Sequence, residues 1–169
     1  MQDELDRLGA EGGAMLDAGD AAGALVRFER GLALSREAAV MPTVAWFAAH
    51  VGFALVALER HAEAVYPLTE ALIRGQIGNP YVHMQRGIAL YGSGDLKEAK
   101  EELFKAAALA GQDVFTGVDA TYWDFAIKGM RLPAGVSRWE DWDGCEPGSP
   151  MHSALCNPGM YRMFVPKAD

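Results

Sequence analysis

The sequence predicts an all-α fold in which pairs of helices follow one another along the chain, with a capping helix and an irregular tail at the C-terminal end. Three observations predict it. A glycine stands 12 residues before an alanine three times, at successive offsets of 40 and 35 residues. Apolar residues recur at helical spacing around each of these positions. A short polar or glycine-containing break separates the two helical segments of every unit.

The small residues of the repeat explain how the two helices of a unit meet. Antiparallel helices joined by a short turn approach closely only where a side chain at their crossing is small. Glycine inside a helix costs about 1 kcal/mol relative to alanine, so its recurrence indicates that close approach offsets this cost. The small residues are Gly12, Gly52 and Gly87 on the first helices and Ala24, Ala64 and Ala99 on the second helices.

Each second helix continues the pattern with a large and then a small side chain. The large residue follows the alanine by four positions, which is about one helical turn, and is expected to fill the space between the helices. The small residue comes three positions later. These residues are Phe28 and Gly31, Leu68 and Ala71, and Leu103 and Ala106.

Short turns are expected inside each unit. Gly19 and Gly94 can adopt the left-handed backbone conformation that often ends a helix. Asp20 and Asp95 can then cap the helix that follows. The middle turn, Glu59–His61, lacks a glycine and departs from this pattern.

The segment after the third unit predicts one more short helix. Asp119 is expected to cap a helix over about 120–128, and Gly129 is expected to end it. A row of stacked helix pairs needs such an end piece to cover its last open face. The covering residues are expected to be Tyr122, Trp123 and Phe125.

Residues 130–169 differ in composition from the rest of the chain. They hold five of the eight prolines, yet they also contain aromatic and methionine residues that a disordered tail would lack. We therefore expect an irregular arm packed on the body. Within it, Ser137 and Glu140 form a capping-box pattern that predicts about one and a half helical turns ending at Gly144.

The repeat resembles the tetratricopeptide repeat (TPR), a helix-turn-helix unit of 34 residues. The similarity covers about residues 4–111, and the small–large–small spacing of the second helices is its most specific part. It implies a right-handed superhelical stack of three TPR-like helix pairs. A departure is that the large aromatic residue usual early in the first helix is replaced by Leu8, Ala48 and His83. The implied division is a solenoid over 1–129, with units at about 4–36, 43–76 and 79–111 and a capping helix at about 119–129, followed by the arm 130–169.

The composition limits the classes of function. Half of the residues are apolar and 22% are charged, which is typical of a soluble globular protein. The net charge of -8 argues against nucleic acid as a partner and favours basic partners, although it is equally explained by solubility alone. The two cysteines do not make a disulfide framework, and the acidic start is not a signal peptide, so we expect a cytoplasmic protein.

One uncharged stretch, Ala39–Leu58, approaches the length of a membrane-spanning helix. It contains Pro42, Thr43 and His50, and it also fits the helical repeat, which a membrane span has no reason to do. We therefore expect this segment inside the protein body, and no membrane as a partner.

The sequence carries no recognisable catalytic pattern. It has no phosphate-binding loop, no nucleophile elbow and no histidine pair at metal-binding spacing. Cys145, His152 and Cys156 suggest zinc at first sight, but a structural zinc site requires four ligands and no fourth is evident. Asp141 and Asp143 are interpreted as part of a solvated turn. We predict no catalytic residue, no metal, no cofactor and no enzyme activity.

The first helix of each pair is expected to line the concave side of a curved stack. The resemblance to TPR proteins implies that this lining binds peptides or protein segments. It lacks the lysine–arginine clamp with which some relatives hold an acidic peptide terminus. An alternative is that the chain's own tail covers the lining. The register places there Asp6, Gly9, Gly13, Leu16 and Asp17, then Trp46, Ala49, Phe53 and Val56, then Tyr81, Met84, Ile88 and Tyr91.

The third unit and the segment after it carry a narrower resemblance. Gly78–Tyr81, His83, Asp113–Gly117 and the aromatic run from Tyr122 are similar to the last repeat of small bacterial TPR proteins found beside secreted polymorphic toxins. This resemblance implies an immunity protein that binds a toxin domain and inhibits it. Two alternatives stay open: a scaffold or secretion chaperone for an apolar segment, and an enzyme or zinc protein that uses the tail.

Overall fold

The computed structural model describes residues 1–145, and these residues form helices and connecting turns without a β-strand. The predicted all-α class is therefore confirmed. The long elements are α1 (Gln2–Asp17), α2 (Ala21–Glu37), α3 (Met41–Ala57), α4 (His61–Ala71), α5 (Pro80–Ser93), α6 (Leu96–Ala110) and α7 (Ala120–Ile127). Three short turns of helix accompany them, η1 (Leu72–Gln76), η2 (Asp113–Phe115) and η3 (Trp139–Asp141).

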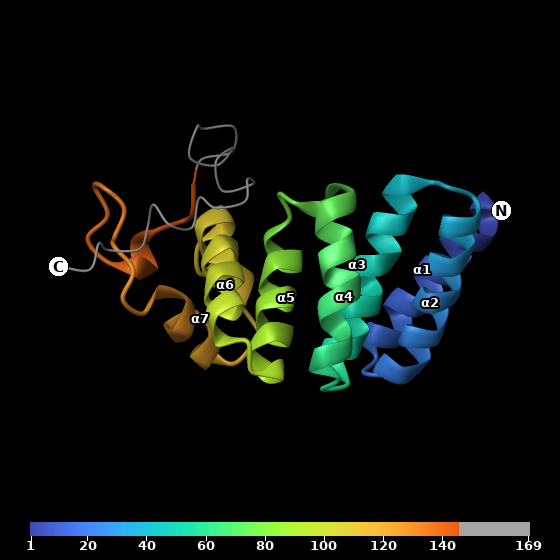
Figure 1. Ribbon diagram of the computed structural model, residues 1–169, viewed down its shortest axis with the longest axis horizontal. Coiled ribbons are helices and arrows are strands. Elements are labelled where there is room, and N and C mark those ends of the chain that lie inside the picture. Colours follow the sequence, from blue (N-terminus) through green and yellow to red (C-terminus); the bar gives the residue numbers. More distant parts are fainter. Residues whose placement is uncertain (146–169) are drawn as a thin grey trace.

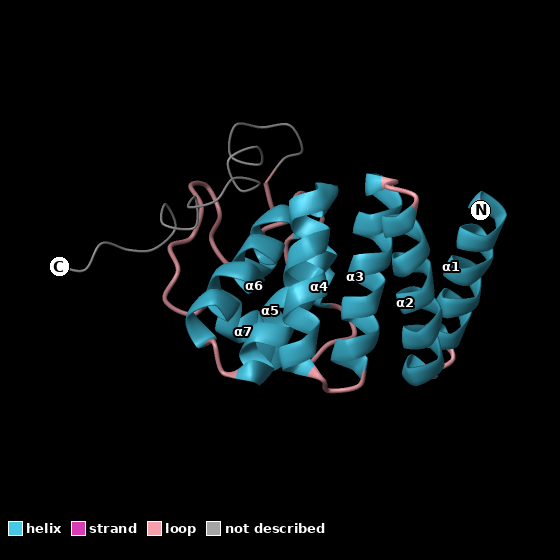
Figure 2. Ribbon diagram, turned by 45° about the vertical axis from the view of Figure 1, so that its right-hand side comes forward, coloured by secondary structure: helices cyan, strands magenta, loops and turns pink. Residues whose placement is uncertain are grey.

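The helices stand side by side in chain order, from α1 at one end of the molecule to α7 at the other (Figure 1). Each helix packs mainly against its neighbours in the chain, and α3 also contacts α5. Short loops join α1 to α2, α2 to α3 and α3 to α4, so these consecutive helices run in opposite directions (Figure 2). The result is a row of helices whose contacts are local in sequence.

Each predicted crossing brings a glycine against the large residue of the following helix. A Cβ atom placed on Gly12 would lie 2.5 Å from the ring of Phe28, which is completely buried. A larger residue at the glycine would therefore push the two helices apart, and the expected reason for the glycine is confirmed. In the same way, a Cβ atom placed on Gly52 would lie 2.3 Å from the side chain of Leu68, and one on Gly87 would lie 2.5 Å from that of Leu103.

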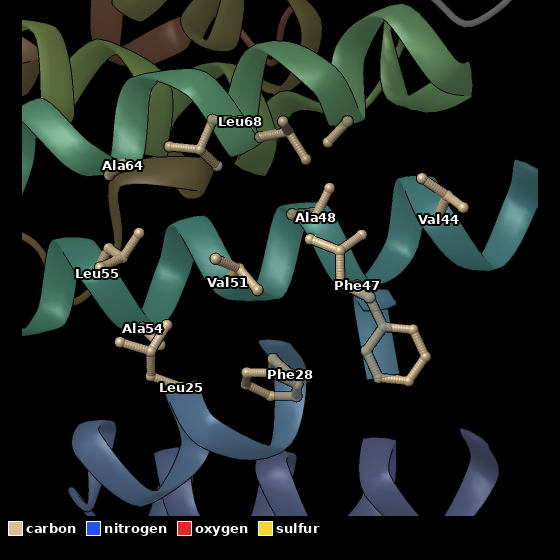
Figure 3. Close-up of a cluster of buried hydrophobic side chains, with 14 of the residues drawn as sticks. Leu25, Phe28, Val44, Phe47, Ala48, Val51, Ala54, Leu55, Ala64 and Leu68 are labelled. Atoms are coloured by element: carbon tan, nitrogen blue, oxygen red, sulfur yellow. The ribbon is translucent and has the colours of Figure 1, made fainter. Parts of the chain in front are cut away.

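The third position of the repeat joins one unit to the next. A Cβ atom on Gly31 of α2 would lie 2.2 Å from the ring of Phe47 of α3, so this glycine admits the aromatic ring. Figure 3 shows α3 packed on two sides, by Leu25 and Phe28 on one side and by Leu68 on the other. Much of the uncharged stretch that contains α3 is thus buried in the core. Within residues 1–145, no helix has both the length and the apolar character required to cross a bilayer.

Two of the turns form as their residues predict. Gly19 and Gly94 have φ angles of +83° and +92°, in the left-handed region. The carboxylate of Asp20 accepts a hydrogen bond from a backbone N–H three residues later, and Asp95 does the same. One free N–H group at the start of each of α2 and α6 is thereby satisfied.

The middle turn reaches a similar shape without glycine. Glu59 adopts a φ of +58°, and Ala39, between α2 and α3, adopts a φ of +53°. Both residues are exposed, and both carry a Cβ atom in a conformation that disfavours one. The helix that follows Glu59 has no side-chain cap. Backbone hydrogen bonds hold the connection from α3 to α4, because the N–H of Glu59 donates to the carbonyl of Val56 and that of Arg60 to the carbonyl of Leu55, both at 2.9 Å.

The end of the row is closed by α7, which begins and ends as expected. Asp119 accepts the N–H of Thr121 at 2.8 Å, and Gly129, with a φ of +73°, lies just beyond the helix. The side chain of Lys100, on α6, donates to the carbonyl oxygens of Phe125 and Lys128 and so satisfies the C-terminal end of α7.

The predicted helix near the start of the arm is wrong in extent. Only a single 3-10 turn, η3, forms, and Ser137 makes no capping hydrogen bond to it. Arg138 is extended and its guanidinium pairs with Asp141 at 2.8 Å. Trp139 and Trp142 both pack on the ring of Phe104 of α6, with centroid separations of 6.0 and 6.2 Å. Packing of two indoles on one ring therefore overrides the local helix signal.

Backbone contact holds the arm against the end of α6. A Cβ atom on Gly111 would lie 2.5 Å from the carbonyl oxygen of Trp142, and one on Gly144 would lie 2.8 Å from the nitrogen of Ala110. The N–H of Cys145 donates to the carbonyl of Ala108 at 2.7 Å. The predicted arm beyond residue 145 lies outside the described residues, as do His152 and Cys156 of the zinc alternative.

Candidate functional site

Three aromatic side chains follow one another along one side of α3. The rings of Trp46 and His50 are stacked, with centroids 3.7 Å apart and planes inclined by 24°. The ring of Phe53 lies 5.2 Å from that of His50. Spacings of four and three residues place the three rings on one helix face. We call Trp46, His50 and Phe53 the aromatic strip.

A hollow of about 340 Å³ lies between α1 and α3, at one end of the aromatic strip. A small residue of α1 helps to leave this space, because a Cβ atom on Gly9 would lie 3.3 Å from the indole of Trp46. We call this space the α1–α3 hollow. It is lined by Gln2, Leu5, Asp6, Gly9, Ala10, Thr43, Trp46 and Phe47.

His50 is held in one tautomer by its own helix. Its Nδ1–H donates to the carbonyl oxygen of Trp46 at 2.8 Å, so Nε2 carries the lone pair. Burial lowers the pKa of His50, against the opposite effect of the Trp46 carbonyl. The ring is therefore neutral at pH 7 and stacks on Trp46 as an uncharged plane. The register did not place His50 in the lining, although its spacing from Trp46 and Phe53 is the signal that finds it.

The lining residues predicted on α1 and α3 are mostly accessible. Asp6 and Asp17 are exposed, and Gly9, Gly13 and Leu16 are partly exposed. On α3, Trp46 is 37% exposed, and Phe53 and Val56 are partly buried. Ala49 is buried and belongs to the core. Asp6, Gly9 and Trp46 are brought together at the α1–α3 hollow, whereas Asp17 does not line it.

The lining residues predicted on α5 are mostly covered by η2 and α7. Met84 and Ile88 are buried in a cluster that includes residues of η2 and α7. Tyr91 packs edge-on against Tyr122 and Phe125 of α7, at 5.5 and 5.0 Å. Tyr81 is exposed, but it does not line the α1–α3 hollow. The accessible part of the predicted lining is thus concentrated on α1 and α3.

The arm leaves the aromatic strip uncovered as far as Cys145. Trp139 and Trp142 lie on Phe104 of α6, and the cluster around them holds residues of α6 and of the arm itself. The alternative in which the tail covers the lining is therefore not realised by residues 130–145.

A buried charged cluster joins α5 to α6. The Nδ1–H of His83 donates to Oε2 of Glu102 at 2.7 Å, and its Nε2–H donates to the carbonyl of Ile77 at 2.7 Å. Both ring nitrogens therefore face acceptor oxygens. Arg86 and Lys105 contact the other carboxylate oxygen at 3.2 and 2.7 Å. Burial opposes ionisation of Glu102, but the hydrogen bond and charge interaction with His83, together with the cations Lys105 and Arg86, lower its pKa to about 2.

We interpret this cluster as a structural link between α5 and α6 rather than as a reactive site. Glu102 and His83 are 4% and 3% exposed, and every hydrogen-bonding position of the imidazole is used inside the protein. The cluster fixes the segment before α5 to α6. Among residues 1–145, no group of three or more histidine, cysteine, aspartate or glutamate side chains is arranged to hold a metal ion.

The α1–α3 hollow and the aromatic strip together form the candidate functional site. They combine accessible aromatic surface with a carboxylate, Asp6, at the edge of the hollow. Such surfaces suit the anchoring of side chains from another polypeptide. Comparisons of the chain with protein-family models, with curated protein sequences and with solved structures found no match.

Proposed function

We propose that the chain is a non-catalytic module of the TPR type that binds another protein through the α1–α3 hollow and the aromatic strip. In this proposal the three helix pairs form a right-handed superhelical stack with the site on its concave side. The repeated contact between a glycine and a large residue supports such a stack. The observation that carries the proposal is the aromatic strip, in which Trp46 stays 37% exposed beside a hollow.

The most specific form of the proposal is an inhibitor of a bacterial toxin domain, acting in the cytoplasm. The resemblance carried by Gly78–Tyr81 and Asp113–Gly117 motivates it. The net charge of -8 suits a basic partner and speeds their encounter.

A pull-down of the full chain against the product of the adjacent gene, combined with co-expression to measure rescue from toxicity, tests this form. We expect a stable complex and rescue. Trp46→Ala and Phe53→Ala should weaken both by tenfold or more, since aromatic anchors contribute about 2 kcal/mol or more to such interfaces. Tyr66→Ala is the matched control, because Tyr66 is 71% exposed on α4 and outside the site. Absence of binding and rescue rejects the inhibitor.

The second candidate is a scaffold or secretion chaperone that binds an apolar segment. It is favoured by the aromatic character of the strip, which offers little hydrogen bonding apart from Nε2 of His50 and the indole N–H of Trp46. A peptide array should then select short hydrophobic ligands that lose affinity with Phe53→Ala. Selection of charged peptides without aromatic or aliphatic anchors would reject this candidate.

A further inference from the structure

We propose that the α1–α3 hollow receives an arginine side chain of the partner protein, with Asp6 as its counter-ion and Trp46 as its stacking surface. The inference rests on the proposed protein-binding function and adds the chemistry of the group that is bound.

The lining of the hollow matches a long cationic side chain. Its lining includes the apolar residues Leu5, Ala10 and Phe47, and its one charged residue is Asp6. Arginine buries an apolar stem and carries a planar cation at its tip. A guanidinium group stacks on aromatic faces and pairs with carboxylates, and the hollow offers one of each.

Asp6, the carboxylate that lines the hollow, has no cationic partner among the described residues. Its Oδ1 accepts a hydrogen bond from the side-chain amide of Gln2 at 2.8 Å. Within the described part of the chain it forms no ion pair, whereas Arg7 on the same helix pairs with Glu4 at 2.7 Å and with Glu11. A second oxygen of Asp6 is therefore left to accept from a ligand.

Glu11, which follows Ala10 on α1, is already matched by cations. Besides Arg7, it accepts from Arg27 of α2 at 2.9 Å. A cation that approaches α1 from the side of the hollow consequently meets one unneutralised carboxylate, that of Asp6, beside an indole.

Trp46 is prepared as a stacking surface on that side. It stacks on His50, whose ring is neutral, so His50 makes no cation–π contact with this indole. Gly9 keeps the indole accessible, because a side chain at this position would point at it from 3.3 Å. The carboxylate, the indole and the missing side chain thus come from three positions around one space.

The test is an NMR titration of the ¹⁵N-labelled full chain. The chain has four tryptophans, and the indole N–H signal of Trp46 is the one that disappears in Trp46→Phe. The probes are N-acetyl-arginine amide, the lysine analogue and the citrulline analogue, which has the shape of arginine without its charge. We expect a saturable shift of the Trp46 signal with arginine. Citrulline should bind at least tenfold more weakly, and lysine should be intermediate.

Variants locate the site. Asp6→Asn should reduce the affinity for the arginine probe about tenfold and abolish the preference over citrulline. Asp3→Asn, which removes the same charge from an exposed position outside the hollow, should leave the affinity unchanged within twofold. Equal binding of arginine and citrulline, or an unchanged affinity in Asp6→Asn, would overturn the inference. Lysine binding as tightly as arginine would overturn the assignment to a guanidinium.

The partner complex separates this inference from the function on which it rests. If Phe53→Ala disrupts the complex and Asp6→Asn does not, protein binding stands and the arginine site is rejected. If the complex does not form with the unaltered chain, the proposed function fails whatever the NMR result.

Discussion

The imidazole of His83 donates a 2.7 Å hydrogen bond to the carboxylate of Glu102 in a part of the protein where both side chains are almost fully buried. Truncation of either partner leaves charge or hydrogen-bonding capacity without a match. Such losses are among the few that destabilise a protein strongly.

Replacement of His83 by phenylalanine should therefore lower the free energy of unfolding by about 2 kcal/mol, because the carbonyl of Ile77 and one oxygen of Glu102 lose their donor. Urea unfolding followed by circular dichroism measures this change. Glu98→Gln, which alters an exposed partner of Arg86, is the control and should change stability by less than about 0.5 kcal/mol. An unaltered urea midpoint in His83→Phe would show that the cluster does not stabilise the fold.

The acid sensitivity of the fold should depend on Glu102. Its pKa in the folded protein lies below the ordinary value of 4.5, at about 2. The ionised carboxylate thus stabilises the fold above pH 4.5, and this contribution is lost as the pH falls from 4.5 towards 2. The difference in unfolding free energy between the unaltered protein and Glu102→Gln should shrink over that interval. A difference that stays constant with pH would contradict the assignment.

Ser35→Ala should stabilise the protein. Ser35 is completely buried in α2, and its hydroxyl has no hydrogen-bond partner among the described residues. Alanine removes the unsatisfied hydroxyl and favours the helix, which together should add about 1 kcal/mol. Thermal and urea unfolding measure the gain. Ser93→Ala serves for comparison, because the hydroxyl of Ser93 donates to the carbonyl of Leu90 and its removal should give no such gain.

Glu59→Gly should also be stabilising, by about 0.5 to 1 kcal/mol, because glycine adopts a positive φ without strain. The gain is expected only at this position. Ala62→Gly places the same residue in the regular backbone of α4 and should cost about 1 kcal/mol. Equal effects of the two substitutions would mean that the left-handed turn is not under strain.

The helix pairs were predictable because their signals are local and repeated. The distance from Gly12 to Ala24 recurs twice, and Phe28 one turn later specifies what the glycine admits. Turn residues such as Gly94 and Asp95 act over a few positions, so a single sequence reveals them.

The features that were missed depend on contacts distant in sequence. The capping box at Ser137 predicts helix, but Trp139 and Trp142 are drawn to Phe104, about 35 residues earlier in the chain. The register places Ile88 on the lining without showing that α7 and η2 bury it. Position on a helix was thus predictable, whereas the accessibility of that position was not.

The two ends of the helix row are closed very differently. The end at α6 is covered by α7 and by the arm, whereas α1 makes its main helix contact with α2 alone. Spontaneous opening should therefore start at α1, so its amide hydrogens should exchange with solvent faster than those of α5 and α6. Since α1 forms one side of the hollow, a ligand bound there would stabilise the folded position of α1 and slow the exchange of its amide hydrogens.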